Sequence, residues 1–173
     1  MPEEVMLRIE DYMKSGVEFL VGDAPGIDTR FQQILAKHNY RNVTVLSSAD
    51  EVRNNVGKWN TRFVESGLKS KSHARHAAKD RFMTSQAEAG VMIWDKESPG
   101  TIANVIDLVK SGKHCLVFVA GDNNLVNISN NSELENLLIN HLDVRDEAQK
   151  RLIAYDRRLN KKVPFNQTDS LFD

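Results

Sequence analysis

The sequence contains one cysteine, four prolines and no apolar run that approaches the length of a membrane span. A lone cysteine, Cys115, cannot form a disulfide within the chain, and nothing else points to an oxidising compartment. The first 13 residues, MPEEVMLRIEDYM, are acidic and amphipathic, which is unlike a secretory signal or a transit peptide. We therefore expect a cytoplasmic protein that makes no contact with membranes.

An excess of one charge sign is also absent. The chain carries 23 Lys and Arg residues against 24 Asp and Glu residues, which gives a net charge of −1 at pH 7. This balance provides no general attraction for a polyanion, so nucleic acid is not an expected partner. A length of 173 residues with 40% hydrophobic residues is typical of one globular domain. We assign this domain to 1–158 and a flexible C-terminal tail to 159–173.

Strand-like and helix-like patterns alternate along the chain. Segments 47–72 and 122–131 show no period and are predicted to lack regular structure, the second of them as an Asn-rich loop. Short strands that are apolar on both faces and separated by helices predict a single-domain, Rossmann-like α/β fold. Its parallel sheet would carry helices on both faces and bind ligands at the carboxyl ends of its strands. The predicted strands are 17–21, 43–46, 90–94 and 114–120, and the predicted helices are 3–14, 26–38, 74–89, 99–111, 132–141 and 143–157.

Two of the predicted strands end in glycine-containing loops that lead into helices. The first loop, 22–28, reads GDAPGID, and the second, 94–101, reads WDKESPGT. Glycine lets a backbone approach a ligand closely, and the free amides of a helix N-terminus bind anions such as phosphate. The alternative is structural: Asp23 and Asp28 would be a turn residue and a cap, and Ser98 would cap a helix. We expect both loops to meet at one edge of a single sheet.

The GDAPGID loop and the segment KDRFMTSQAEAGVMIWDKESPGT resemble the SLOG superfamily of Rossmann-like nucleotide-binding domains over about residues 18–119. This superfamily includes cytokinin-activating phosphoribohydrolases (lysine-decarboxylase-like proteins) and the DNA-uptake Smf/DprA domains. The resemblance implies a nucleotide-type ligand and a homodimer or larger assembly. Lys79 and Asn104 stand where the phosphoribohydrolases have their catalytic Arg and Glu. An amide cannot replace a carboxylate base, which argues against that hydrolysis.

The polar stretch after the second predicted strand adds ligand candidates at the same edge. Arg53 offers a fork for phosphate, Asn54 and Asn55 offer donors and acceptors, and Trp59 offers a ring that stacks on a base. The alternative is an ordinary polar loop anchored by one tryptophan. The complete set of candidate ligand-binding residues is Gly22, Asp23, Ala24, Gly26, Asp28, Arg53, Asn54, Asn55, Trp59, Lys79, Ser98, Gly100, Thr101 and Asn104.

Asp95 and Asp80 are the carboxylates best placed in the sequence for catalysis. Cleavage of an N-glycosidic bond needs a carboxylate that faces the anomeric carbon, so Asp95 is the first candidate for a hydrolase or deoxyribosyltransferase-like enzyme acting on nucleoside monophosphates. The alternative is that Asp95 simply begins a turn. Three functions therefore stay open: a nucleotide-binding module, such an enzyme, or a protein-interaction subunit with a vestigial pocket.

Three remaining features have weaker functional readings. The basic run over 69–81 can hold phosphates but is more often a solvated helix face. Within it, His73 and His76 have a metal-ligand spacing, yet no cysteine or carboxylate completes a set, so we expect neither a metal nor a cofactor. Cys115 lies in an apolar run and is predicted to be core. Residues 168–172 (TDSLF) resemble a sliding-clamp-binding peptide, with a frayed or subunit-packed terminus as the alternative.

Overall fold

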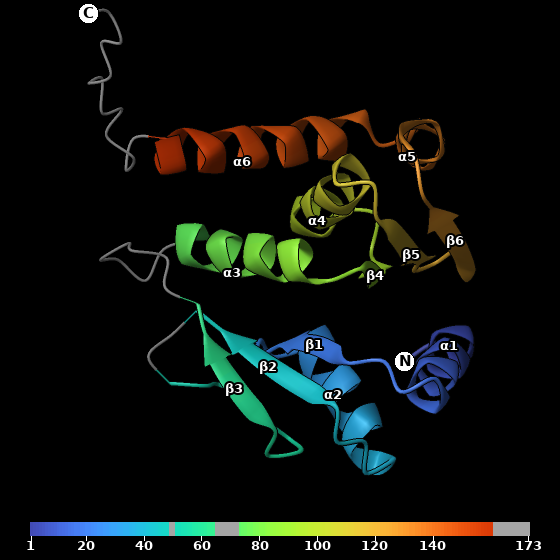
Figure 1. Cartoon of the computed structure of the whole chain (residues 1–173). Coiled ribbons are helices and arrows are strands. Elements are labelled where there is room, and N and C mark those ends of the chain that lie inside the picture. The colour runs from blue at the N-terminus through green and yellow to red at the C-terminus, as the bar shows by residue number, and fades with distance from the viewer. Residues whose placement is uncertain (49–50, 65–72, 161–173) are drawn as a thin grey trace, which may run out of the picture.

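The α/β class predicted from the sequence is confirmed by the computed structural model, which describes residues 1–48, 51–64 and 73–160 (Figure 1). The predicted C-terminal tail, with its clamp-like segment 168–172, lies outside the described residues apart from its first two positions, which belong to the last helix. The elements are α1 (Glu3–Lys14), β1 (Phe19–Gly22), α2 (Ile27–Lys37), β2 (Val43–Ser47), β3 (Asn60–Phe63), α3 (His73–Gln86), β4 (Ala89–Trp94), α4 (Pro99–Lys110), β5 (His114–Val119), β6 (Asn124–Ile128), α5 (Asn131–Leu138) and α6 (Leu142–Asn160).

The strands form two three-stranded sheets. Sheet A has the order β1-β2-β3 and is parallel throughout, with Val21 opposite Val45. Sheet B has the order β4-β5-β6, in which β4 and β5 are parallel and β6 is antiparallel to β5. The expectation of one sheet is therefore wrong, because hydrogen bonds pair the strands as two sets. The two glycine-containing loops consequently follow strands of different sheets, and the expected single edge does not carry both.

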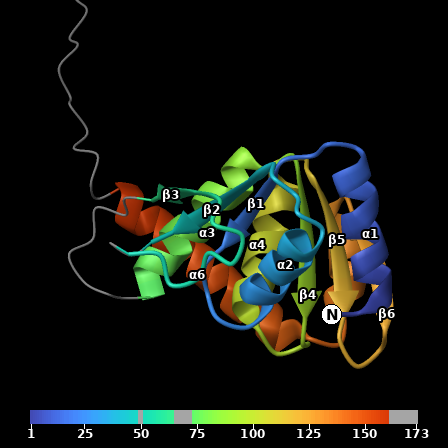
Figure 2. The same ribbon diagram turned by 90° about the horizontal axis from the view of Figure 1, so that it is seen from below.

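Helices pack on both sides of the sheets. In β5, Cys115, Val117 and Val119 point into a core shared with α4, α5 and α6, as the period of two for a strand requires. The side chain of Phe118 points to the opposite face of the sheet and belongs to a second core with residues of α1, α2, β1 and β2. In Figure 1, α1 and α2 lie in the lower half of the molecule and α3 to α6 in the upper half. Figure 2 shows the same arrangement seen from below. Because the second core contains residues of both sheets, the two sheets pack as one unit. Cys115 is completely buried in the first core, which confirms the prediction that it is a core residue.

Two strands were not predicted from the sequence. β3 (NTRF) is polar and mostly exposed, so it carries no apolar signal. β6 lies inside the Asn-rich segment predicted to be a loop, yet Val126 and Ile128 pair with Val117 and Cys115 of β5. The connecting turn contains Gly121, whose φ is +90°, a conformation that favours glycine. The loop prediction is wrong because a high content of asparagine conceals the alternating apolar residues.

The basic run is not a fully solvated face. Lys79 is 4% exposed. Arg81 connects three helices, since its guanidinium donates to Asp107 of α4 and to Asp156 of α6. Lys113 donates to the carbonyls of Thr84 and Ser85 at the end of α3. Residues 69 and 71 and the side chains of 73–76 lie outside what the structure describes. Among the described residues, no helix has the length and apolar character needed to cross a bilayer.

Candidate functional site

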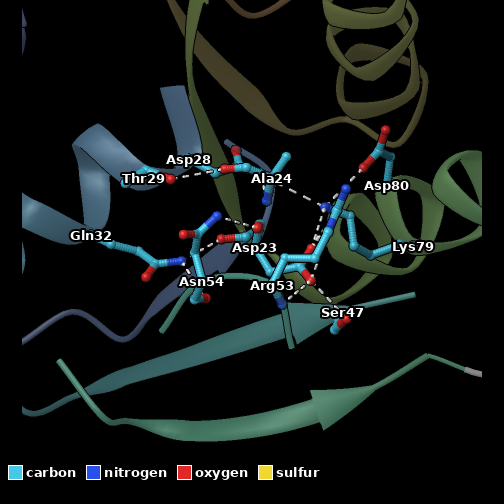
Figure 3. Close-up of polar contacts among 11 residues, drawn as sticks. Asp23, Ala24, Asp28, Thr29, Gln32, Ser47, Arg53, Asn54, Lys79 and Asp80 are labelled. Carbon is cyan, nitrogen blue, oxygen red and sulfur yellow. Dashed lines mark hydrogen bonds and ion pairs between the residues drawn. The ribbon is translucent and has the colours of Figure 1, made fainter. Parts of the chain in front are cut away.

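A group of charged side chains gathers at the carboxyl ends of β1 and β2 (Figure 3). Asp23, directly after β1, is completely buried. Its carboxylate accepts hydrogen bonds from Arg53 Nη2 at 2.6 Å and Arg53 Nε at 3.2 Å. The backbone N–H of Arg53 and the hydroxyl of Ser47 also donate to it, at 3.2 and 2.8 Å. We call Asp23, Asp28, Arg53, Lys79 and Asp80 the Asp23 cluster.

The hydrogen bonds to Asp23 decide its charge. Burial by itself would raise the pKa of this carboxyl, but the hydrogen bonds from Arg53 and Ser47 outweigh burial and lower the pKa to about 2. Attraction to the guanidinium acts in the same direction. The carboxylate raises the pKa of Arg53 in turn. The pair is therefore ionised at neutral pH, and it fixes the segment after β2 to the loop after β1.

Lys79 brings α3 into the same cluster. Its Nζ lies 3.9 Å from Asp23, 3.7 Å from Asp28 and 3.7 Å from Asp80. Gly22 makes this approach possible, because a Cβ there would lie 2.7 Å from Lys79 Nζ and 2.0 Å from Asp28 Oδ2. The glycine at the end of β1 thus leaves room for the chain's own side chains.

The cluster has a buried layer and a partly exposed layer. The side chains of Asp23 and Lys79 are at most 5% exposed, whereas those of Arg53, Asp28 and Asp80 are 36%, 31% and 35% exposed. The buried pair therefore holds three charged groups that solvent reaches. Three carboxylates against two cations give the cluster a formal charge of −1.

The loop from Asp23 to the start of α2 leaves the helix N-terminus open. Gly26 has φ +94° and ψ −120°, a conformation that only glycine adopts without strain. Asp28 accepts a hydrogen bond from Ala24 N at 3.1 Å, and Thr29 Oγ1 donates to Ala24 O. No side chain caps α2, and Gly26 and Ile27 are exposed. The first amides of a helix have no partner within it, so those of α2 are available.

The segment after β2 is only partly a ligand-facing loop. Asn54 donates to Asp23 O at 3.0 Å, close to the cluster. Asn55 instead holds a turn, since it donates to Trp59 O and accepts from Trp59 N. Trp59 is 8% exposed and donates its indole N–H to Tyr40 O. The expectation that Trp59 stacks on a base is not met, because a ring buried in the core cannot reach a ligand at the surface.

Gln32 is the site residue that the sequence analysis missed. It is completely buried and donates to Gly22 O at 2.7 Å and to Asn54 O at 3.2 Å. Its side-chain oxygen accepts from Val56 N at 2.9 Å. From its place on α2, Gln32 therefore links the end of β1 to the segment after β2. The available signal was its place on α2, one helical turn before the buried Leu35.

The second predicted group surrounds the turn between β4 and α4. Asp95 accepts hydrogen bonds from Glu97 N, Ser98 N and Ser98 Oγ at 2.7–3.0 Å. Burial opposes the shift, but these hydrogen bonds lower the pKa of Asp95. Ser98 donates its hydroxyl instead of capping, and no side chain caps α4. Asp95 thus forms a turn, and its catalytic role stays a prediction.

The other candidates of this group lie on α4. Thr101 and Asn104 are half-buried in its first two turns, and a Cβ added at Gly100 would lie 3.7 Å from Arg151 Nη1, an ordinary contact distance. Within the residues that the structure describes, the hydrogen bonds of Asp95 and Ser98 are all local, and none of them reaches the Asp23 cluster. In the same part of the chain, no three His, Cys, Asp or Glu side chains are grouped so that they could hold a metal.

Comparison with known proteins adds no identification: no family model, no curated protein and no solved structure matches the chain.

Proposed function

We propose that this protein binds a nucleotide or a nucleotide-derived ligand at the carboxyl ends of β1 and β2. The observation that carries the proposal is an exposed, uncapped helix N-terminus beside the ordered guanidinium of Arg53. The N-terminus of α2 offers backbone amides to a phosphate, and Arg53 offers a fixed cation. The proposal uses only the loop after β1, because the second glycine loop follows a strand of the other sheet.

The two layers of the Asp23 cluster favour a preorganised ligand site. Both hydrogen bonds from the Arg53 guanidinium go to the buried Asp23, which fixes its orientation before a ligand arrives. The buried Nζ of Lys79 contributes positive charge and lies 3.7–3.9 Å from the three carboxylates. A group that is already held loses little conformational entropy on binding. Such an arrangement suits recognition better than a set of mobile surface charges.

The charge of the cluster argues for a ligand with both phosphate and sugar chemistry. The cluster has a formal charge of −1, and the N-terminus of a helix contributes only about +0.5. The net charge at the site therefore contributes little to the affinity for inorganic phosphate. The half-exposed carboxylates of Asp28 and Asp80 accept hydrogen bonds from ribose hydroxyls, which compensates their negative charge. We therefore expect nucleoside monophosphates to bind more tightly than inorganic phosphate.

Thermal denaturation with AMP, GMP, CMP, UMP and inorganic phosphate tests this function. At a concentration about 100 times the Kd, a bound nucleotide stabilises the fold by about 2.7 kcal/mol, which corresponds to roughly 5–10 °C for a chain of this size. Asp80→Asn should reduce the shift, because the amide keeps only one acceptor oxygen for the sugar and loses the negative charge. The matched control is Asp146→Asn, which changes an exposed aspartate of α6 that pairs with Arg145.

The outcomes separate the open functions. A shift with nucleotides that Asp80→Asn weakens and Asp146→Asn leaves intact supports the binding site. If no nucleotide raises the Tm at millimolar concentration, the proposal fails and a protein-interaction role gains support.

A further inference from the structure

A cavity of about 370 Å³ opens at the carboxyl ends of β4 and β5, away from the Asp23 cluster. Its floor is built from a row of side chains across sheet B, in which Trp94 lies opposite Val119 and Val119 lies opposite Asn124. Helix α5 forms a wall through Glu133, Asn136 and Leu137. The full lining is Trp94, Lys96, Val119, Asp122, Asn124, Val126, Glu133, Asn136, Leu137 and His141. The volume lies in the usual range for small-molecule sites, about 300–1,000 Å³.

One buried group in the cavity wall lacks a partner. Trp94 is completely buried, and its indole nitrogen is the side-chain atom in the described structure that is both buried and without a hydrogen bond. A buried N–H without an acceptor costs about 1–3 kcal/mol, so such groups usually have a partner. The ring of His141, which also lines the cavity, packs against Trp94 with 5.0 Å between ring centroids. Because the indole is completely buried, an acceptor in the cavity reaches it only when the side chains that cover it, His141 among them, move aside.

The charges around the cavity exclude one class of ligand. Lys96 pairs with Asp122 at 2.5 Å, so these two charges cancel. Glu133 remains, and one of its carboxylate oxygens accepts from Ser129 N and Ser129 Oγ. The cavity is therefore neutral to negative, which disfavours a phosphate. The exposed amides of Asn124 and Asn136 offer donors and acceptors at its opening.

We propose that this cavity is a second binding site, for a neutral or cationic planar nitrogen heterocycle. The partly exposed apolar side chains of Val126 and Leu137, with Val119 beside them, pack against the face of such a ring. A ring nitrogen accepts from the Trp94 indole, and ring N–H groups donate to Glu133 or Asn136. The site shares no residue with the Asp23 cluster, so the inference is independent of the proposed nucleotide site.

Adenine is a suitable probe, and NMR of the two tryptophan indole N–H groups is a direct measurement. The chain contains only Trp59 and Trp94. Trp59 already donates to Tyr40 O, so its indole signal should stay in place, whereas that of Trp94 should shift downfield on binding. Trp94→Phe assigns the two signals. Ribose 5-phosphate, an anion without a flat ring, should produce no shift.

Substitutions on α5 locate the binding. Asn136→Phe fills the cavity and should weaken adenine binding about tenfold or more, a loss of about 1.4 kcal/mol. Glu135→Phe is the matched control, because Glu135 is the exposed preceding residue and is not part of the lining. The proposal is overturned if millimolar adenine leaves the Trp94 signal unchanged, or if Asn136→Phe and Glu135→Phe bind equally well. An equal shift with ribose 5-phosphate also overturns it. Gly26→Ala should leave the adenine shift intact, which separates this site from the nucleotide site.

Discussion

The carboxyl ends of the two sheets have the same place in the topology but different contents. At the end of sheet A, charged side chains of the chain itself gather around the buried Asp23. At the end of sheet B, Asp95 makes a local turn, and a cavity remains beside Trp94. Several ion pairs between distant parts of the sequence thus meet at the end of sheet A, whereas the end of sheet B has the local hydrogen bonds of Asp95 and a single such ion pair, Lys96–Asp122.

The glycines that follow from similar sequences at the two strand ends are there for different physical reasons. Gly22 is required because Asp28 and Lys79 occupy the space that its side chain would take. Gly100, in the first turn of α4 after the corresponding strand of sheet B, has its nearest neighbour at an ordinary contact distance of 3.7 Å. A glycine after a strand therefore does not by itself indicate a ligand. The neighbours of the missing Cβ decide which role it has.

The largest expected difference between the two strand ends comes from their aspartates. Asp23→Asn leaves Arg53 without its carboxylate partner and removes one of the three carboxylates around the buried Lys79, and loss of one partner in a buried ion pair costs about 3–5 kcal/mol. We expect this loss in the free energy of unfolding measured with urea. A loss below about 1 kcal/mol would show that the Asp23 cluster does not hold sheet A together, since surface pairs contribute that little.

Acid should weaken the sheet A end more than the sheet B end. The pKa of Asp23 is about 2 in the folded chain against 3.8 as the ordinary value, so ionised Asp23 stabilises the fold above pH 4. This contribution, about 2 kcal/mol, disappears as the pH falls from 4 through 2. Urea denaturation of the wild type and of Asp23→Asn at each pH isolates the effect. The stability difference between them should shrink over this interval, and a constant difference would contradict the assignment.

The two loop glycines should respond differently to alanine. Gly22→Ala forces the ends of two flexible side chains to move, and we expect a loss of about 1 kcal/mol, the lower end of the range for overpacking. Gly100→Ala places alanine in the first turn of α4 with no close contact, so the change should be neutral or stabilising by up to about 1 kcal/mol. Thermal denaturation of both variants checks the contrast, which equal losses would refute.

The smallest effect is expected at Asp95. Asp95→Asn keeps an oxygen that accepts from Ser98 N, and asparagine is about as good as aspartate in such positions, so the loss should stay below about 0.5 kcal/mol. This variant also tests the enzyme alternative. Release of free base from a nucleoside monophosphate by the wild type, abolished in Asp95→Asn, would establish Asp95 as catalytic. With no release by the wild type, the turn is its role.

The helices and the apolar strands were predictable because their signals are local. The strands 90–94 and 114–120 follow from continuous apolar runs, and β4 and β5 fall within one residue of those limits. The division into two sheets has no local signal, since it depends on which strand edges meet. β6 shows a further limit, because alternating apolar residues in an Asn-rich segment read as a loop until a partner strand is known.

The candidate site was predictable in its parts and not in its contacts. Asp23, Arg53 and Lys79 were all candidates, yet they are far apart in sequence and meet only through the parallel pairing of β1 with β2 and the position of α3. Trp59 was predicted to meet a ligand because a sequence does not distinguish an exposed ring from a buried one. Gln32 was missed because a polar residue on a helix is ordinarily exposed.

Calorimetric titration of AMP into the wild type, Gly26→Ala and Gly112→Ala tests the nucleotide site most directly. Both glycines have positive φ and no neighbour within 4 Å of an added Cβ, so both variants carry backbone strain, but only Gly26 precedes the open N-terminus of α2. The wild type and Gly112→Ala should bind AMP with similar affinity, and Gly26→Ala should bind about tenfold more weakly or not at all. Equal binding by all three proteins, or none by the wild type at millimolar AMP, would contradict the proposed site.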